Sequence, residues 1–140
     1  MAKTVLSFEP DFDFRIIGIS CHAKDYRLIW TINRELDFNL RKTNDHEIVT
    51  GKKDARKSSF SQFIWDDEEQ MKSYTLFSNR SQGGLLVPEM KQADFLLILK
   101  GNFSNTDISE LKEKINSLDV VLAAFEIQVD SLKSKLNLIF

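Results

Sequence analysis

The sequence predicts an α+β domain in which an antiparallel-rich sheet carries two helices on one face. Three observations support this fold class. Short segments rich in β-branched and aromatic residues are typical of strands, and two longer segments repeat apolar residues at helical spacing. Each helical segment also stands between two strand-like segments, so a strand–helix–strand pattern occurs twice.

The first strand–helix–strand unit opens with residues 12–20, whose Phe and Ile content predicts a strand. Residues 23–36 are predicted to be helical. Their broad apolar stripe, which is expected where a helix packs on a sheet, comprises Tyr26, Leu28, Ile29, Trp30, Ile32 and Leu36. A short strand over residues 38–41 should follow this helix.

The middle of the chain is predicted to be antiparallel. Residues 42–58 are polar and charged, which favours a mobile loop or a frayed hairpin. Strands are expected at about 60–66 and 72–79, and a glycine-containing turn at 81–84 should follow them. The short apolar run before Pro88 cannot take a central ladder position, because proline lacks the N–H that the ladder needs.

The second unit opens with residues 94–100, a continuous apolar run that predicts a strand buried on both faces. A helix should begin after a cap at one of Ser104, Asn105 and Thr106. Asp107 suits the positive N-terminal end of this helix. The predicted apolar face of the helix consists of Ile108, Leu111, Ile115 and Leu118.

A strand over residues 120–127 should close the second unit. Two β-α-β halves around an antiparallel middle are close to a ferredoxin-like arrangement with extra strands. Right-handed crossovers would place both helices on one face, leaving the other face open or covered by the middle hairpin and the tail. We expect one domain over residues 1–140, with a charged loop at about 42–58 and a C-terminal tail at 130–140.

The composition is that of an ordinary globular protein, with 42% hydrophobic and 29% charged residues among 140. The net charge of −2 predicts no general attraction to nucleic acid or to an anionic membrane. A single cysteine excludes an internal disulfide. The acidic residues near the N-terminus argue against a signal peptide, and no window approaches the ~20 apolar residues of a membrane span. We therefore expect a cytoplasmic protein.

Residues 87–95 read Val-Pro-Glu-Met-Lys-Gln-Ala-Asp-Phe. Pro88 fixes a backbone φ angle, while Glu89 and Asp94 can accept hydrogen bonds from nearby backbone N–H groups. These features are typical of a turn that enters a central strand at Phe95. We interpret the segment as structural.

This segment resembles the signature of the IPExxxVDY family, small proteins of Bacteroidetes named for that stretch. Pro88, Glu89 and Asp94 match the signature directly, and the mild departures are Val87, Ala93 and Phe95. The overall length and the type of C-terminal end are also similar. The resemblance implies a cytoplasmic bacterial protein of unassigned function, and it transfers no activity, cofactor or catalytic residue. The missing tyrosine hydroxyl at Phe95 argues against catalysis by that position.

Cys21 and His22 place a potential nucleophile beside a potential base. Neighbours on an extended strand point to opposite faces, so the two converge only if they lie at a strand–helix junction. The alternative is a small buried cysteine followed by a histidine near the start of a helix. A catalytic site here would need a pocket that joins these residues or Tyr26 with a carboxylate.

No metal or cofactor is predicted. A metal site needs three or four ligands at suitable spacing, and the sequence Asp45-His46-Glu47 falls in a charged segment where solvated side chains are expected. The glycines at 83 and 84 precede a strand rather than a helix, so they do not form a phosphate-binding loop.

The strongest local patch is a basic run made up of Lys52, Lys53, Arg56 and Lys57. The aromatic residues Phe60, Phe63 and Trp65 follow it, and cations interleaved with aromatic rings are typical of RNA-binding surfaces. The alternative is that these aromatic residues belong to the core while the basic residues lie in a solvated loop.

Three functional hypotheses follow. The first is a non-catalytic interaction module that binds an unidentified protein or itself, through edge strands beside Pro88 or in the middle hairpin. The second is a small-ligand or RNA-binding regulatory domain, which rests on analogy of fold. The third is an enzyme with a site near Cys21 and His22.

Overall fold

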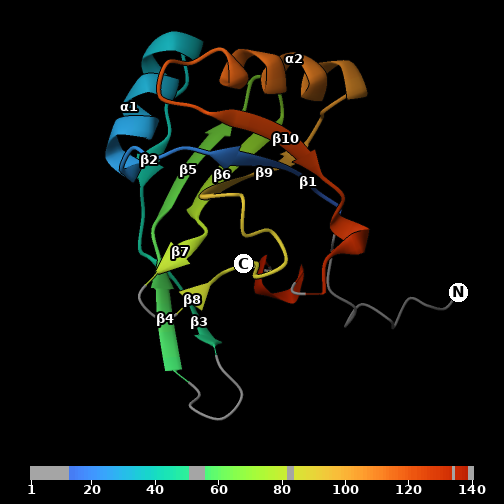
Figure 1. The fold of residues 1–140 in the computed structure, drawn as a ribbon. Coiled ribbons are helices and arrows are strands. Elements are labelled where there is room, and N and C mark those ends of the chain that lie inside the picture. Colours follow the sequence, from blue (N-terminus) through green and yellow to red (C-terminus); the bar gives the residue numbers. More distant parts are fainter. Residues whose placement is uncertain (1–12, 51–55, 82–83, 134, 139–140) are drawn as a thin grey trace, which may run out of the picture.

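The computed structural model describes residues 13–50, 56–81, 84–133 and 135–138. Within these residues the chain forms a six-stranded sheet in which all neighbouring strands are antiparallel. In spatial order the strands are β10 (Ala123–Ile127), β1 (Arg15–Ser20), β9 (Phe95–Gly101), β6 (Lys72–Ser78), β5 (Gln62–Asp67) and β2 (Arg41–Lys42) (Figure 1). The predictions of an α+β domain and of an antiparallel-rich sheet are confirmed.

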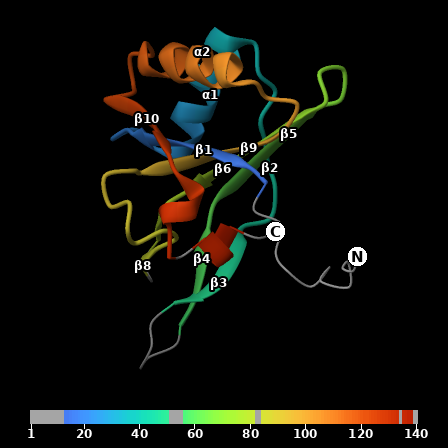
Figure 2. The ribbon, with the colours of Figure 1, turned by 90° about the vertical axis from the view of Figure 1, so that its right-hand side faces the viewer.

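The remaining described elements lie on either side of this sheet. Both helices, α1 (Asp25–Leu36) and α2 (Asn105–Asn116), are drawn above it in Figures 1 and 2. Below it are two small hairpins and two 3-10 turns, which are β3 (His46–Thr50) with β4 (Arg56–Phe60), β7 (Arg80–Ser81) with β8 (Gly84–Leu85), η2 (Val129–Ser131) and η3 (Lys135–Leu138). In the described part of the chain, no helix has both the length and the apolar character that a membrane span requires.

A first core lies between the helices and the sheet. It takes alternate residues of the central strands, such as Ile17 and Ile19 of β1 and Leu97 and Leu99 of β9. From the helices it takes Leu28, Ile29, Ile32, Ile108, Leu111 and Ile115, and Leu118 joins it from just after the end of α2. The apolar face predicted for α2 is therefore confirmed, and β9 is buried over its first five residues as the continuous apolar run predicted.

A second core lies on the opposite face of the same sheet. Ile16 of β1 and Leu96 and Ile98 of β9 point into it, because successive strand residues face opposite sides. Covering residues from distant segments complete this core, and they include Phe60, Leu86, Val87, Leu132 and Leu138. The middle hairpin and the tail thus bury the face that the helices leave uncovered. Tail residues 134, 139 and 140 lie outside the described residues.

The prediction of a charged loop at about 42–58 is wrong, because β3 and β4 form a hairpin there. Their pairing runs from His46 opposite Phe60 to Thr50 opposite Arg56. The hairpin alternative is the one observed. Its strands are polar because one side faces solvent, where Lys57 forms a 3.0 Å ion pair with Glu47. The sequence pattern resembles a loop since only isolated residues of each strand reach the second core.

The expected strand at 38–41 is also displaced, since β2 begins only at Arg41. The side chain of Asn33 in α1 donates to the carbonyl oxygen of Leu40 and accepts from its N–H, both at 3.0 Å. These two bonds occupy the backbone groups that Leu40 would need in a ladder.

The predicted apolar stripe of α1 is wrong at two positions. Tyr26 and Trp30 are 67% and 59% exposed, whereas Leu28, Ile29 and Ile32 are buried. Six large apolar residues in a twelve-residue helix exceed what one packed face can bury. The surplus leaves two aromatic side chains on the outer surface.

Helix α2 begins with a capping box. The Ser104 hydroxyl accepts from the Asp107 N–H at 3.0 Å, and the Asp107 carboxylate accepts from the Ser104 N–H at 3.0 Å. The bond from the Ser104 N–H, with a smaller contribution from Lys72, lowers the pKa of Asp107. The cap fixes the start of the helix whose C-terminal end borders the groove described below.

We expect Asp107→Asn to lower the thermal midpoint at neutral pH, because the amide keeps the shape of the cap but loses the charge. A lowered folded-state pKa stabilises the protein above the unfolded pKa, and this contribution disappears as the pH falls through the folded pKa. The difference between the variant and the parent should therefore shrink as the pH falls through the lowered folded-state pKa of Asp107. Thermal unfolding followed by circular dichroism measures this difference in thermal midpoint. A difference that persists unchanged in acid would contradict a stabilising role for the Asp107 charge.

Candidate functional site

The segment 87–95 folds as two consecutive turns that lead into β9. The Met90 N–H bonds to the Val87 carbonyl at 3.1 Å with Pro88 between them, and the Ala93 N–H bonds to the Met90 carbonyl at 3.0 Å. Phe95 then begins the strand and is buried in the first core. The segment thus forms the turn through which the chain enters β9.

A fully buried side chain, Asn79, holds this segment in place. Its amide nitrogen donates to the carbonyls of Ala93 at 2.9 Å and Met90 at 3.1 Å, and its amide oxygen accepts from the Val87 N–H at 2.7 Å. One side chain therefore replaces the ladder partners that this irregular backbone lacks. Sequence reasoning missed this role, because nothing local to Asn79 indicates partners eight to fourteen residues away.

Asp94 joins the motif to the β1–α1 connection. One carboxylate oxygen accepts from the Cys21 N–H at 2.8 Å, and the other accepts from the Arg80 guanidinium at 2.7 Å. Arg80 also donates to the carbonyl of Lys91 at 2.6 Å. Both oxygens of Asp94 are thus engaged in structural contacts. The Glu89 side chain is exposed at the turn.

Cys21 and His22 do lie at a strand–helix junction, beside a cavity of about 380 Å³ that Arg80 and Asp94 also line. Cys21 is buried within the first core, whereas His22 is exposed. Burial raises the pKa of the Cys21 thiol, which favours the protonated form rather than a nucleophilic thiolate. The arrangement fits a small core cysteine better than an activated one.

The basic run falls only partly within the described residues. Lys52 and Lys53 lie outside them, Arg56 begins β4, and Lys57 is paired with Glu47, which lowers the pKa of that carboxylate. The aromatic residues that follow are engaged elsewhere. Phe60 is buried in the second core, Phe63 is buried in the first, and the half-buried Trp65 stacks on Tyr74 at 4.9 Å. These rings do not form a base-stacking platform beside the lysines.

The Asp45-His46-Glu47 cluster is likewise divided among separate partners. Asp45 pairs with Lys42, His46 bonds through Nε2 to the carbonyl of Asn137 at 2.7 Å, and Glu47 pairs with Lys57. Over the described ranges, no group of three or more His, Cys, Asp and Glu side chains is placed to hold a metal ion.

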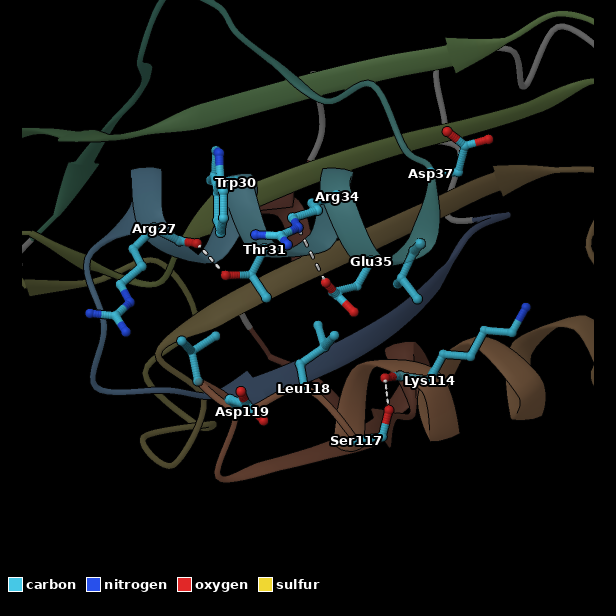
Figure 3. A pocket seen from close by; sticks show the side chains of 12 residues that line it. Arg27, Trp30, Thr31, Arg34, Glu35, Asp37, Lys114, Ser117, Leu118 and Asp119 are labelled. Atoms are coloured by element: carbon cyan, nitrogen blue, oxygen red, sulfur yellow. Dashed lines mark hydrogen bonds and ion pairs between the residues drawn. The ribbon is translucent and has the colours of Figure 1, made fainter.

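A groove of about 690 Å³ lies between α1 and the C-terminal end of α2 (Figure 3). Its floor includes the buried Leu118, and its remaining wall residues are Arg27, Trp30, Thr31, Arg34, Glu35, Leu36, Asp37, Lys114, Ser117, Asp119 and Val120. Sequence analysis did not identify this groove, because it assigned Trp30 to the core.

Trp30 is the main apolar feature of the groove wall. The Arg34 guanidinium lies 5.0 Å from the centre of its ring, and Arg34 also pairs with Glu35 at 3.6 Å. This contact leaves more than half of the indole in solvent. An exposed tryptophan on a well-packed helix is suited to binding rather than to catalysis.

Comparison with known proteins gives no relative: no family model, curated protein or solved structure matches the chain.

Proposed function

We propose that this chain is a non-catalytic cytoplasmic protein-interaction module whose contact surface is the groove between α1 and α2. The observation that carries the proposal is the 59% exposure of Trp30 beside this groove. Contiguous exposed apolar surface often marks a contact site, and tryptophan contributes much of the binding energy of many interfaces. Tyr26, one helical turn earlier on α1, extends the same exposed apolar surface.

We also propose a ferredoxin-like arrangement for the strands β10, β1, β9 and β6 with the two helices, β5 and β2 being additions to it. Their spatial order and antiparallel pairing support this. Membership of the IPExxxVDY family is a further proposal, and the structural roles of Pro88 and Asp94 support it. Neither proposal specifies a partner.

The test is capture of binding partners by the tagged full-length chain from a lysate of its native organism, with and without RNase. We expect a stoichiometric protein that survives RNase and that Trp30→Ser no longer captures. Met71→Ser is the matched control, because Met71 is 74% exposed in the β5–β6 turn, away from the groove. Undiminished capture by Trp30→Ser would contradict the proposal, and loss of all partners with RNase would favour the basic run instead.

A further inference from the structure

We propose that the partner in this groove is the same groove of a second copy, so that the chain forms a two-fold symmetric dimer through α1 and α2. The inference rests on the proposed function and names its partner. It is carried by the arrangement of charges around Trp30.

Four charged side chains mark the corners of the groove. Arg27 of α1 and Asp119 lie at one end, while Asp37 and Lys114 lie at the other (Figure 3). Among the described residues, none of these four side chains forms an ion pair. Along the α1 side of the groove the charge therefore changes from positive at Arg27 to negative at Asp37. Along the α2 side it changes from negative at Asp119 to positive at Lys114.

This alternating pattern is complementary to itself under two-fold rotation. A face-to-face dimer requires an axis that lies in the contact plane. With the axis across the helices, Arg27 faces Asp37 of the second copy and Lys114 faces Asp119. With the axis along the helices, Arg27 faces Asp119 of the second copy and Lys114 faces Asp37.

Either axis brings opposite charges together at all four corners. A strongly acidic or strongly basic partner would instead meet a like charge at two of them, which opposes association. The central charges of Arg34 and Glu35 already neutralise each other. A second copy is therefore the occupant that the charge pattern favours.

The apolar residues lie where such a contact needs them. Along α1, Trp30 lies between the two ends of the groove, and the buried Leu118 lies between α1 and α2 (Figure 3). A central aromatic residue surrounded by polar and charged groups is the usual composition of a protein interface. Dimerisation would remove the exposed indole from water.

The first experiment is sedimentation equilibrium of the untagged full-length chain from about 1 µM to about 1 mM. We expect a monomer–dimer equilibrium that weakens as salt is added, because the corner charges are exposed. Trp30→Ser should raise the dimer dissociation constant by about 30-fold or more. Met71→Ser should leave it unchanged, and circular dichroism verifies that each variant is folded.

The second experiment exchanges charges. Asp119→Arg should weaken the dimer, since it places like charges together under either axis. Adding Lys114→Glu restores association if the axis lies across the helices, and adding Arg27→Glu restores it if the axis lies along them. Restoration by one double variant and not by the other supports the inference, whereas restoration by neither overturns it.

Two outcomes separate this inference from the proposed function. A chain that stays monomeric at about 1 mM overturns the dimer, while Trp30-dependent capture of a different protein would leave the interaction module standing. A dimer that is insensitive to both Trp30→Ser and Asp119→Arg also overturns the inference, because it must use another surface.

Discussion

Asn79→Ala is expected to lower the free energy of unfolding by about 3 to 5 kcal/mol, the largest effect of a single side chain that we predict. The substitution leaves the N–H of Val87 and the carbonyl of Ala93 buried without their partner, and it removes one of the two hydrogen bonds to the Met90 carbonyl. Each unsatisfied buried group costs about 1 to 3 kcal/mol, and a small cavity adds to the loss. Urea unfolding followed by circular dichroism measures the change.

Two further variants distinguish lost hydrogen bonds from lost volume. Asn79→Asp has the same shape but replaces the donating amide with an oxygen that faces two carbonyls, so it should destabilise the fold at least as much. Asn102→Ala is the matched control, because Asn102 is exposed and only its backbone N–H is bonded, to Met71. The explanation fails if Asn79→Asp is as stable as the parent at neutral pH.

The consequence of losing Asn79 extends beyond stability. Its contacts fix the segment that ends in Asp94, and Asp94 accepts from the Cys21 N–H just before α1. We therefore expect the start of α1 to loosen in the Asn79 variant, which hydrogen exchange of the α1 amides would detect. Through this contact the motif supports the helix that carries Trp30.

Gly101→Ala is expected to destabilise the protein by about 2 to 4 kcal/mol. Gly101 has a φ of +106°, which L-residues rarely adopt, and an added Cβ would lie 2.3 Å from the carbonyl oxygen of Met71. That oxygen cannot move freely, because it accepts from the Asn102 N–H at 2.9 Å. The substitution combines backbone strain with a steric overlap at the junction of β9 and β6.

Gly84→Ala is the control that separates the two causes. Gly84 also has a positive φ of +137°, but an added Cβ would meet nothing within 4 Å. Gly84→Ala should therefore lower the free energy of unfolding only through backbone strain, by about 1 kcal/mol or slightly more. Equal losses in the two variants, measured by chemical denaturation, would show that the Met71 contact contributes nothing.

The sequence by itself determined the elements whose signals are local. The apolar run at 94–100 predicted β9, because a strand covered on both faces needs no alternation. The capping residues and the apolar face of α2 are likewise spaced within a few residues of one another, so helical periodicity was sufficient. Pro88 predicted a turn through its fixed φ angle.

Only the tertiary structure decided which apolar residues are left exposed. Tyr26 and Trp30 fit the helical period as well as Leu28 and Ile29 do, and packing against the sheet selected between the two sets. The role of Asn79 and the covering of the second core by Leu138 depend on contacts between residues far apart in sequence. Local patterns do not encode such contacts, since they arise only when the chain has closed on itself. The candidate site, a groove bordered by two helices some eighty residues apart, belongs to this second class.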